Sequence, residues 1–504
     1  MFLRKLKSKN GNTYVQVVDK SSGKYKVVKS FGGSDDPNQV EAKVHRAKSW
    51  MRRSSGMNEL DFSNSDQLIE QFLGSIDKMK RVGFDYLLGR IFCDIGFDRI
   101  KDEFFKYLVL GRIAYPKSKL KTTEFLLRYH HIDWNEDQVY RYLDKLYSTQ
   151  KEIVQQISYQ HTLKVLDNKL SVVFYDVTTL YFEIDQEDDL RKTGFSKEGK
   201  HQNPQIVLGL LVSKNGYPLA YEIFEGNKFE GHTMLPVVDA FKHKYSLKQL
   251  VIVADSGLLS SSNIEEMQKK GYEFIIGARI KTEKDLIKKK IFALELSNGQ
   301  SAIINKGAMK LIITYSEDRA KKDRYNRDKG LRRLEKQLNK GRLTKSNINN
   351  RGYNKYLKLE GEVKISIDQE RITKDKKWDG LKGYLSNAKM SKNVIIENYQ
   401  HLWQIEKAFR IAKSDLKIRP VYHRLEKRIE AHICISFAAY KVYKELERQL
   451  KEKKAEISAN KAIEIAENIF EIEAILPNSG KRIKKTLLLT QEQKYLAELF
   501  DFGC

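Results

Sequence analysis

The feature that most constrains this chain is an apolar stretch with a single acid at its centre. Residues 171–183 read Ser-Val-Val-Phe-Tyr-Asp-Val-Thr-Thr-Leu-Tyr-Phe-Glu, in which β-branched and aromatic residues surround Asp176. Such a run is typical of a buried strand. A carboxylate inside it loses hydration that apolar neighbours cannot replace, so Asp176 needs a cation nearby.

A second stretch of the same kind ends in a second acid. Residues 250–257 read Leu-Val-Ile-Val-Ala-Asp-Ser-Gly, so Asp255 lies at the end of an apolar run and before a glycine-containing loop. Taken alone, either acid is equally well explained by a turn or a helix N-cap. Two strand acids in this order favour a metal site.

The order of the predicted elements indicates the fold of this region. The expected elements are strands over 170–182, 204–212 and 217–224, a helix over 233–244, a strand over 250–255, a helix over 262–270 and a strand over 272–278. Asn215 and Gly216 mark a hairpin between the second and third strands. The β-β-β-α-β-α-β order is that of the ribonuclease H-like fold, in which the first and fourth strands are neighbours. It predicts that Asp176 and Asp255 meet at one edge of the sheet.

Six regions are expected along the chain, and two of them form this core; 504 residues exceed the size of one ordinary domain. They are an N-terminal β-hairpin and helix (1–64), a helical, candidate DNA-binding domain (65–165), the first part of the core (166–280), a β-rich and basic insertion (281–392), a helix that completes the core (393–450) and a C-terminal helical region (451–504). The predicted fold class is α/β, with a ribonuclease H-like mixed sheet interrupted by the insertion.

Two short helices in the helical domain are candidates for contact with DNA. They are predicted over 118–127 and 135–146, with a short non-helical stretch between them. A helix-turn-helix would present Gln138, Arg141 and Lys145 to a DNA groove. A plain helical hairpin has the same pattern, so both interpretations stay open.

The net charge favours a polyanionic partner. The chain has 92 Lys and Arg against 66 Asp and Glu, a balance of +26, and such a chain repels itself unless a polyanion offsets the charge. Nucleic acid is the partner that this composition favours, and a merely lysine-rich composition is the alternative. Residues 319–351 hold 13 Lys and Arg against three acids. They form either a solvated or disordered segment or a clamp on a phosphate backbone.

The composition also excludes several classes of protein. Cys93, Cys434 and Cys504 are too scattered for a disulfide framework or a Cys-ligated zinc, and they suit a reducing cytoplasm. No apolar run is long enough to span a membrane, and the first residues lack the apolar centre of a signal peptide. We therefore expect a large cytoplasmic protein with no membrane partner.

A third acid lies in a strongly helical stretch over 393–413. Tyr399, Trp403, Glu406, Arg410 and Lys413 recur at spacings that place them on one face of a single helix. An acid among aromatic and basic residues suits a surface that contacts both a metal and a phosphate. An amphipathic surface helix with a Glu406–Arg410 ion pair is the plainer alternative.

Asp176, Asp255 and Glu406 together resemble the DDE triad of bacterial insertion-sequence transposases with a β-rich insertion between the second and third acids. That group carries a Tyr-x2-Arg-x3-Glu-x6-Lys signature. Tyr399, Glu406 and Lys413 occupy the matching positions in this chain.

The chain departs from the signature at one position, where Leu402 replaces the Arg. A guanidinium at that position can bind a phosphate oxygen through two hydrogen bonds, and Leu cannot. Arg410, one turn beyond Glu406, is the nearest candidate for the missing cation, with Lys413 and Arg419 as alternatives.

The resemblance implies phosphodiester chemistry with two divalent ions about 3.5–4 Å apart. Carboxylate oxygens select Mg²⁺, with Mn²⁺ as a substitute, over zinc. We expect Asp176 to bridge the two ions, and Asp255 and Glu406 to bind one ion each. The contacts to DNA phosphate are assigned to Tyr399, Arg410 and Lys413.

The resemblance also implies the biological reaction. A transposase of this group nicks the ends of a mobile DNA element and joins them to target DNA. It works on double-stranded DNA in a paired-end complex, hence as at least a homodimer, in the bacterial cytoplasm at the nucleoid. The alternatives are a ribonuclease H-like nuclease that does not join strands, and a non-catalytic DNA-binding relic.

Overall fold

The computed structural model describes residues 1–55, 63–196, 199–258, 260–360, 364–476 and 480–503, which form two compact units. The first unit comprises Met1–Met79 and Ile472–Lys485, and the second comprises Lys80–Glu471 and Thr486–Cys504. Within these ranges, every helix is either too short or too polar to cross a lipid bilayer. Residues 56–62, near the end of the N-terminal region expected over 1–64, lie outside the described residues.

The first unit begins with a small antiparallel sheet. Its strands are β1 (Phe2–Lys7), β2 (Thr13–Asp19) and β3 (Lys26–Ser34), and helix α1 (Pro37–Ser54) packs on them. Val15, Val17, Val40 and Val44 form the core between the sheet and the helix. The predicted hairpin is confirmed as β2–β3. Strand β1 was missed because lysines and an arginine interrupt its apolar pattern.

The remaining strands of this part of the chain correct two predictions. Helix α2 (Ser63–Gly74) is followed by a sheet in the order β16-β15-β4, formed by β4 (Ile76–Arg81), β15 (Phe470–Ile475) and β16 (Arg482–Leu487). The prediction that 451–504 is helical is therefore wrong for β15 and β16, and the prediction that 65–165 is helical is wrong for β4. The alternating sequence Phe-Glu-Ile-Glu-Ala-Ile in β15 has the period of a strand.

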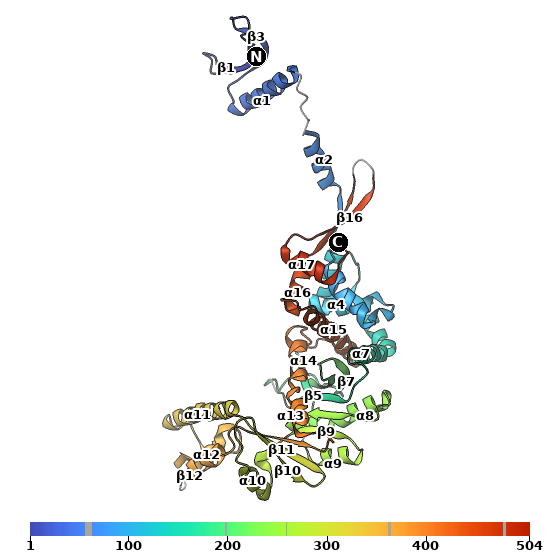
Figure 1. Cartoon of the computed structure of the whole chain (residues 1–504), viewed down its shortest axis with the longest axis vertical. Coiled ribbons are helices and arrows are strands. Elements are labelled where there is room, and N and C mark those ends of the chain that lie inside the picture. The colour runs from blue at the N-terminus through green and yellow to red at the C-terminus, as the bar shows by residue number, and fades with distance from the viewer. Residues whose placement is uncertain (56–62, 197–198, 259, 361–363, 477–479, 504) are drawn as a thin grey trace. The chain divides into compact units, whose positions relative to one another are not determined.

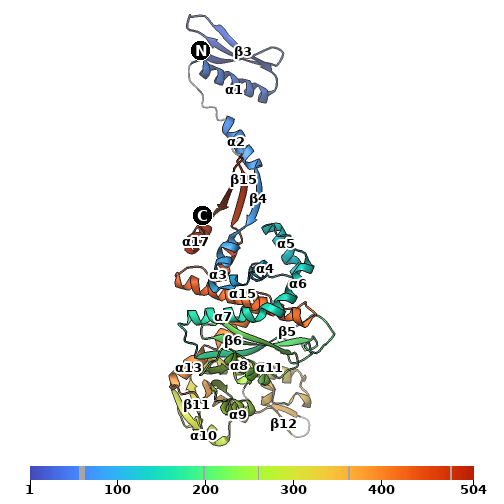
Figure 2. The ribbon, with the colours of Figure 1, turned by 90° about the vertical axis from the view of Figure 1, so that its right-hand side faces the viewer.

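Helices of the second unit surround one long central helix, α15 (Glu426–Glu452). Its neighbours are α3 (Arg90–Ile95), α4 (Glu103–Ala114), α6 (Glu136–Lys145) and α7 (Lys151–Val165). Figure 2 shows α7 and α15 crossing above the strands of the core sheet. Helix α15 is buried along most of its length, so it joins the helical region to the sheet.

The core sheet has eight strands in the order β10-β11-β14-β9-β8-β5-β6-β7. Its first five strands along the chain are β5 (Val172–Tyr181), β6 (Gln205–Ser213), β7 (Pro218–Glu225), β8 (Val251–Ala254) and β9 (Glu273–Ala278). Strands β5, β6 and β7 are antiparallel, whereas β5, β8 and β9 are parallel. This confirms the ribonuclease H-like order and the predicted pairing of the first and fourth strands.

Helices cover both faces of this sheet, and the side chains of β5 alternate between them. Val173, Tyr175 and Val177 belong to one hydrophobic core, with α8 (Met234–Lys244) and α9 (Ser261–Lys269) on that face. Phe174 and Leu180 belong to the other core, together with side chains of α15. The period of two places Asp176 on the same face as Phe174.

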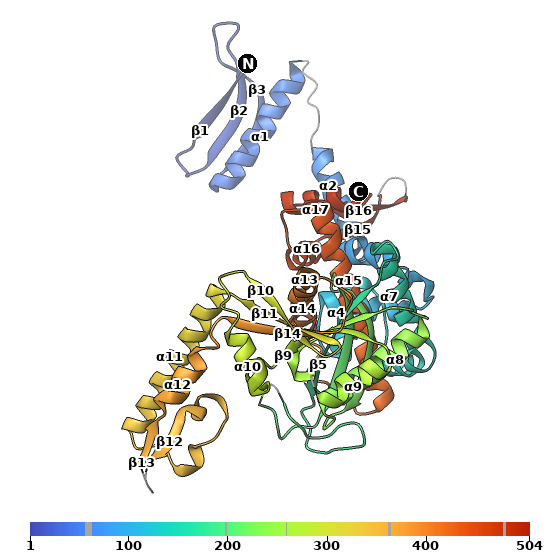
Figure 3. The same ribbon diagram turned by 60° about the horizontal axis from the view of Figure 1, so that its bottom comes forward.

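The insertion adds strands to the sheet and a separate lobe. Its elements are α10 (Asp285–Phe292), β10 (Ser301–Lys306), β11 (Met309–Tyr315), α11 (Glu317–Asn339), β12 (Leu357–Glu360), β13 (Lys364–Ile367), α12 (Gln369–Lys376) and β14 (Leu381–Ser386). Strands β10, β11 and β14 extend the core sheet. Figure 3 shows α11, α12, β12 and β13 gathered into the lobe, which has its own core around Leu334 and Tyr356. Much of the basic segment 319–351 is thus the ordered helix α11.

Candidate active site

The two strand acids lie side by side on one face of the sheet. Strand β5 pairs with β8 in parallel, with Tyr175 opposite Ala254, so Asp176 and Asp255 are the next residues of two neighbouring strands. Val251 and Val253 share the hydrophobic core that contains Phe174. By the same alternation, Asp255 projects to the face to which Asp176 belongs.

The third acid comes from a helix that is broken. The stretch predicted as a single helix over 393–413 is two helices, α13 (Lys392–Gln400) and α14 (Trp403–Ser414). Helix α13 packs on β8 and β9, whereas α14 packs on β5 and β6. Figure 1 shows α14 and α13 one after the other beside the core sheet. Because neighbouring strands are twisted relative to one another, one straight helix cannot follow both pairs. The break separates Tyr399 on α13 from Glu406 on α14, and they do not share one helical face.

Asp255 and Glu406 line the same pocket, of about 450 Å³, which we call the acidic pocket. Tyr399, Leu402 and Trp403 form part of its wall, and the backbone of β9 and β14 forms another part. Glu406 is exposed, and Trp403 is 50% exposed. Asp176 is not among the lining residues, so the structure brings two of the three predicted acids into one pocket and places the third beside Asp255.

Tyr399 is fixed against Asp255. Its hydroxyl donates a hydrogen bond to Asp255 Oδ1 at 3.1 Å, and its ring packs edge-on against Tyr384 at 4.8 Å between centroids. Burial, together with the Asp255 carboxylate, raises the pKa of Tyr399 well above its usual value, so the hydroxyl stays protonated as a donor. The ring fits because β9 has Gly277 below it, where a Cβ atom would collide with the Tyr399 hydroxyl oxygen.

Two cations from the insertion enter the acidic pocket. Lys382 on β14 is half-buried, with its ammonium 4.5 Å from the centroid of the Tyr399 ring. Burial and the nearby Arg319 lower the pKa of Lys382, while Asp255 and Glu406 oppose that shift. Arg319 lies in the first turn of α11, which Ser316 begins by accepting a hydrogen bond from the Arg319 amide. The pocket therefore contains two carboxylates and two cations.

Sequence reasoning did not single out either cation. Arg319 is the first residue of the basic segment noted above, but the charge of that segment did not distinguish it from 12 other Lys and Arg residues. Lys382 carries no local signal at all. Only the antiparallel pairing of β14 with β9 brings it to the acids.

The other predicted phosphate-binding residues lie outside the acidic pocket. Tyr399 lines it, but Arg410 and Lys413 do not. Arg410 is exposed, and its charge acts on Tyr443 of α15. Among the described residues, Glu406 and Arg410 form no ion pair. The cations that line the acidic pocket together with Leu402 are Arg319 and Lys382.

The candidate helix-turn-helix consists of α5 (Lys119–His130) and α6, as the pattern predicts. The side chain of Gln138 closes a capping box with Asn135 at the start of α6. Lys145 forms an ion pair with Asp102 at 2.7 Å, and Arg141 is exposed. Two of the three side chains assigned to DNA thus have a partner within the protein.

The donor atoms of the site fit a hard divalent cation. Within the described ranges, no three His, Cys, Asp or Glu side chains are grouped closely enough to hold a metal ion between them. Magnesium sites commonly use one or two carboxylates, and waters and substrate phosphates complete the coordination. The pair Asp176 and Asp255 and the pair Asp255 and Glu406 each supply two carboxylates. Two further groups act on Asp255: the Tyr399 hydroxyl donates a hydrogen bond to it, and the charge of Lys382 interacts with it.

Comparison with known proteins identifies the family of the chain. No curated protein is similar enough to match the chain. One similar solved structure is the cryo-EM structure of the piggyBac transposase synaptic complex with hairpin DNA, with 9% identity, a TM-score of 0.38 and coverage of 79% of each chain. The family described as "Transposase DDE domain" matches residues 167–441, more than half of the chain, from the start of the core to α15. The chain belongs to the transposase DDE domain family.

Proposed function

We propose that the protein is a transposase that nicks the ends of a mobile DNA element and joins them to target DNA, with Asp176, Asp255 and Glu406 as its metal-binding triad. The observation that carries the proposal is the placement of these acids. Asp176 and Asp255 come directly after two opposed residues, Tyr175 and Ala254, on two neighbouring parallel strands. Glu406 lines the same pocket as Asp255. Double-stranded DNA and a second copy of the chain in a paired-end complex are the proposed partners.

Divalent metal ions, Mg²⁺ or Mn²⁺, would polarise the phosphate and activate the attacking hydroxyl in this site. Asp255 and Glu406 would hold one ion each, and Asp176 would bridge the two. Tyr399 keeps Asp255 oriented through its hydrogen bond, as a positioning residue. The exposed position of Glu406 and the open pocket leave room for a DNA strand beside the acids.

Arg319 and Lys382 would bind the phosphate in place of the signature Arg that Leu402 replaces. Both line the acidic pocket together with Leu402, whereas Arg410 does not. Burial lowers the pKa of Lys382, so a phosphate that approaches would stabilise its charged form. An insertion that supplies these cations would therefore be part of the active site rather than an appendage.

The test is nicking and joining of a duplex that carries the ends of the element, in Mg²⁺. Asp176→Asn, Asp255→Asn and Glu406→Gln should each lower both reactions at least about a thousandfold, or about 4 kcal/mol, while DNA binding is retained. Glu265→Gln, an exposed acid on α9, serves as the matched control. Retained cleavage in any triad variant removes that residue from the site. Nicking without joining in the wild type would identify a hydrolytic nuclease instead.

A further inference from the structure

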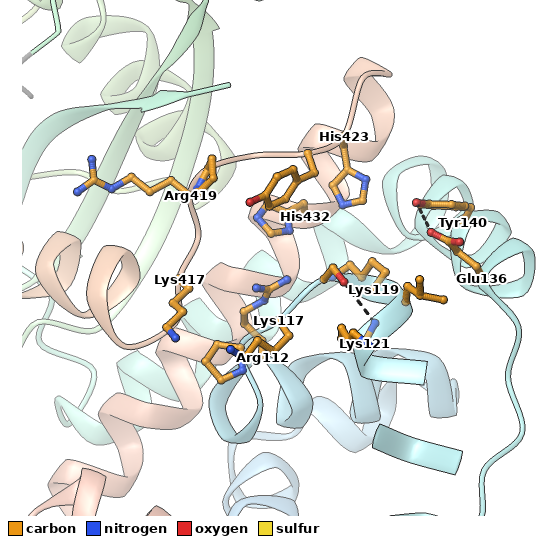
Figure 4. Close-up of a pocket in the computed structure, with 15 residues that line it drawn as sticks. Arg112, Lys117, Lys119, Lys121, Glu136, Tyr140, Lys417, Arg419, His423 and His432 are labelled. Atoms are coloured by element: carbon orange, nitrogen blue, oxygen red, sulfur yellow. Dashed lines mark hydrogen bonds between the residues drawn. The ribbon is translucent and has the colours of Figure 1, made fainter. Parts of the chain in front are cut away.

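A second pocket in the same unit has an unusual concentration of positive charge. It has a volume of about 390 Å³, and its walls come from the end of α4, the start of α5, α6, the 417–423 loop and α15. Its basic lining residues are Arg112, Lys117, Lys119, Lys121, Lys417 and Arg419. We call it the basic pocket, and Figure 4 shows these side chains, with Arg419 extending away from the others.

Two of these cations are buried without a counter-ion. Arg112 is 7% exposed and Lys119 is 6% exposed. Within the described residues, Arg112 Nε has no hydrogen-bond partner, and neither side chain forms an ion pair. Burial lowers the pKa of Arg112 to about 10, and no neighbouring acid opposes that shift. Burial and the charge of Arg112 lower the pKa of Lys119 well below its usual value.

Among the described residues that line the basic pocket, one is an acid, and it already has a partner. Glu136 accepts a hydrogen bond from the Tyr140 hydroxyl at 2.7 Å. Lys121 forms its ion pair with Glu124, an exposed residue that does not line the pocket. The acids near the pocket therefore leave Arg112 and Lys119 uncompensated.

Burial and the same two cations lower the pKa values of the two histidines of the pocket. Burial, with Lys119 and Arg112 as the next causes, lowers the pKa of His423 to about 3. His432 is 5% exposed, and burial with the same two cations lowers its pKa well below the usual value. Both rings are thus neutral at pH 7 and contribute no further charge.

The backbone adds to the positive charge of the pocket. The pocket is lined by residues 116–121, which contain the N-terminus of α5 with Ser118 as its N-cap. The N–H groups of a first helical turn have no acceptor within the helix, and the helix dipole is positive at that end. Phosphate groups bind at such ends when cations accompany them.

We propose that the basic pocket is a phosphate-binding site in which Arg112 and Lys119 hold a phosphate group, supplied by a DNA strand or by a free phosphate compound. A buried cation without a counter-ion is costly, and two adjacent ones are costlier. An anion that enters the pocket removes this cost and gains charge-assisted hydrogen bonds. The site does not depend on the metal-binding triad.

The first test is titration of the full chain with inorganic phosphate, without divalent metal and at an ionic strength fixed by chloride. We expect saturable binding at one site, measured by calorimetry. Phosphate should also protect Lys119 from acetylation, measured by mass spectrometry, while the exposed Lys269 on α9 stays reactive. Absence of saturable binding, or acetylation of Lys119 that does not change when phosphate is added, would overturn the proposal without any substitution.

Substitutions then test the two cations. Lys119→Met and Arg112→Gln should each weaken phosphate binding at least about tenfold, because each removes a charge-assisted contact. Lys269→Met should bind as the wild type does. Removing an uncompensated buried charge is not expected to unfold the protein, which a melting curve checks. Wild-type affinity in a folded Lys119→Met protein would overturn the assignment.

A last arm distinguishes the two sources of phosphate. Binding of a short duplex of arbitrary sequence is measured by fluorescence anisotropy over a range of salt. If a DNA strand occupies the pocket, the slope of log affinity against log salt falls by about 0.9 in Lys119→Met, and free phosphate competes. An unchanged slope assigns the pocket to a free phosphate compound. Because metal is absent throughout, failure here and failure of strand transfer remain distinct.

Discussion

The acidic pocket and the basic pocket belong to the same unit, but they balance charge in opposite ways. In the acidic pocket, Asp255 and Glu406 are matched by Lys382 and Arg319 from the insertion. In the basic pocket, Arg112 and Lys119 are buried beside one another, and no acid of the described residues forms an ion pair with either of them. The first pocket is neutral on its own, and the second is not.

This difference indicates which kind of ligand each pocket would bind. If metal ions bind Asp255 and Glu406, Lys382 and Arg319 would be able to bind a phosphate instead, so a balanced pocket would suit a catalytic cycle. Buried cations that have no carboxylate partner need an anionic ligand to compensate their charge, so such a pocket suits the binding of an anion. The predictions below alter one side of this comparison at a time.

Among the variants that alter this comparison, the largest effect is expected from the cations of the acidic pocket. The double variant Arg319→Met with Lys382→Met should lower strand transfer about a hundredfold, or about 2.7 kcal/mol, because two phosphate contacts are lost. Arg410→Met is the matched control from α14, and it should keep the wild-type rate. Leu402→Arg should partly restore the double variant. A loss in Arg410→Met with a normal double variant would return the phosphate contact to Arg410.

A smaller effect is expected from the hydrogen bond that holds Asp255. Tyr399→Phe removes the 3.1 Å bond from the hydroxyl and leaves the ring in place. The Mg²⁺ concentration for half-maximal nicking should rise about tenfold, as for other groups that orient a metal ligand. Trp403→Phe, at an exposed wall position without a contact to Asp255, is the control. An unchanged Mg²⁺ requirement in Tyr399→Phe would show that Asp255 needs no such support.

The smallest effect concerns stability and pH in the basic pocket. Lys119 is charged in the unfolded chain below its ordinary pKa of 10.5, whereas burial and Arg112 lower its pKa in the folded protein. The unfolded state binds more protons between these two pKa values, so the free energy of unfolding rises with pH across that window. Lys119→Met should therefore be more stable than wild type at pH 7, by about 1 kcal/mol, and this advantage should shrink as the pH approaches 10.5.

Denaturant unfolding at a series of pH values measures this difference. Lys269→Met is the control, because an exposed lysine should change stability little at any pH. A wild-type protein that is as stable as Lys119→Met at pH 7 would mean that the folded pocket compensates the Lys119 charge. The contrast between the two pockets would then disappear.

The sequence predicted the core of the fold because its signals are local and repeated. The apolar runs around Asp176 and Asp255 define β5 and β8, and the hairpin turn at Gly216 fixes the neighbouring strands. The order of strands and helices along the chain then predicted which strands of the sheet are neighbours. The strands β1 and β16 were missed because charged residues interrupt their apolar pattern, whereas β15 was missed although its sequence alternates with the period of a strand.

The candidate site was predictable only in part. Asp176 and Asp255 stand out because carboxylates are rare in apolar runs, and Glu406 stands out because it matches a signature. The cations have no such signal. Lys382 and Arg319 reach Asp255 through strand pairing and the start of α11, which are tertiary features. The break between α13 and α14 was missed because the helical pattern continues across it, and the break arises from packing on a twisted sheet.

The most direct test of the triad is to map where the metal binds. Fe²⁺ replaces Mg²⁺ at oxygen-ligand sites, and with ascorbate and peroxide it cleaves the polypeptide close to the bound ion. We predict cleavage of the full chain near Asp176, Asp255 and Glu406, suppressed by excess Mg²⁺, with the fragments identified by mass spectrometry. Cleavage that omits one of these three segments, or that occurs at unrelated segments instead, would contradict a shared metal site.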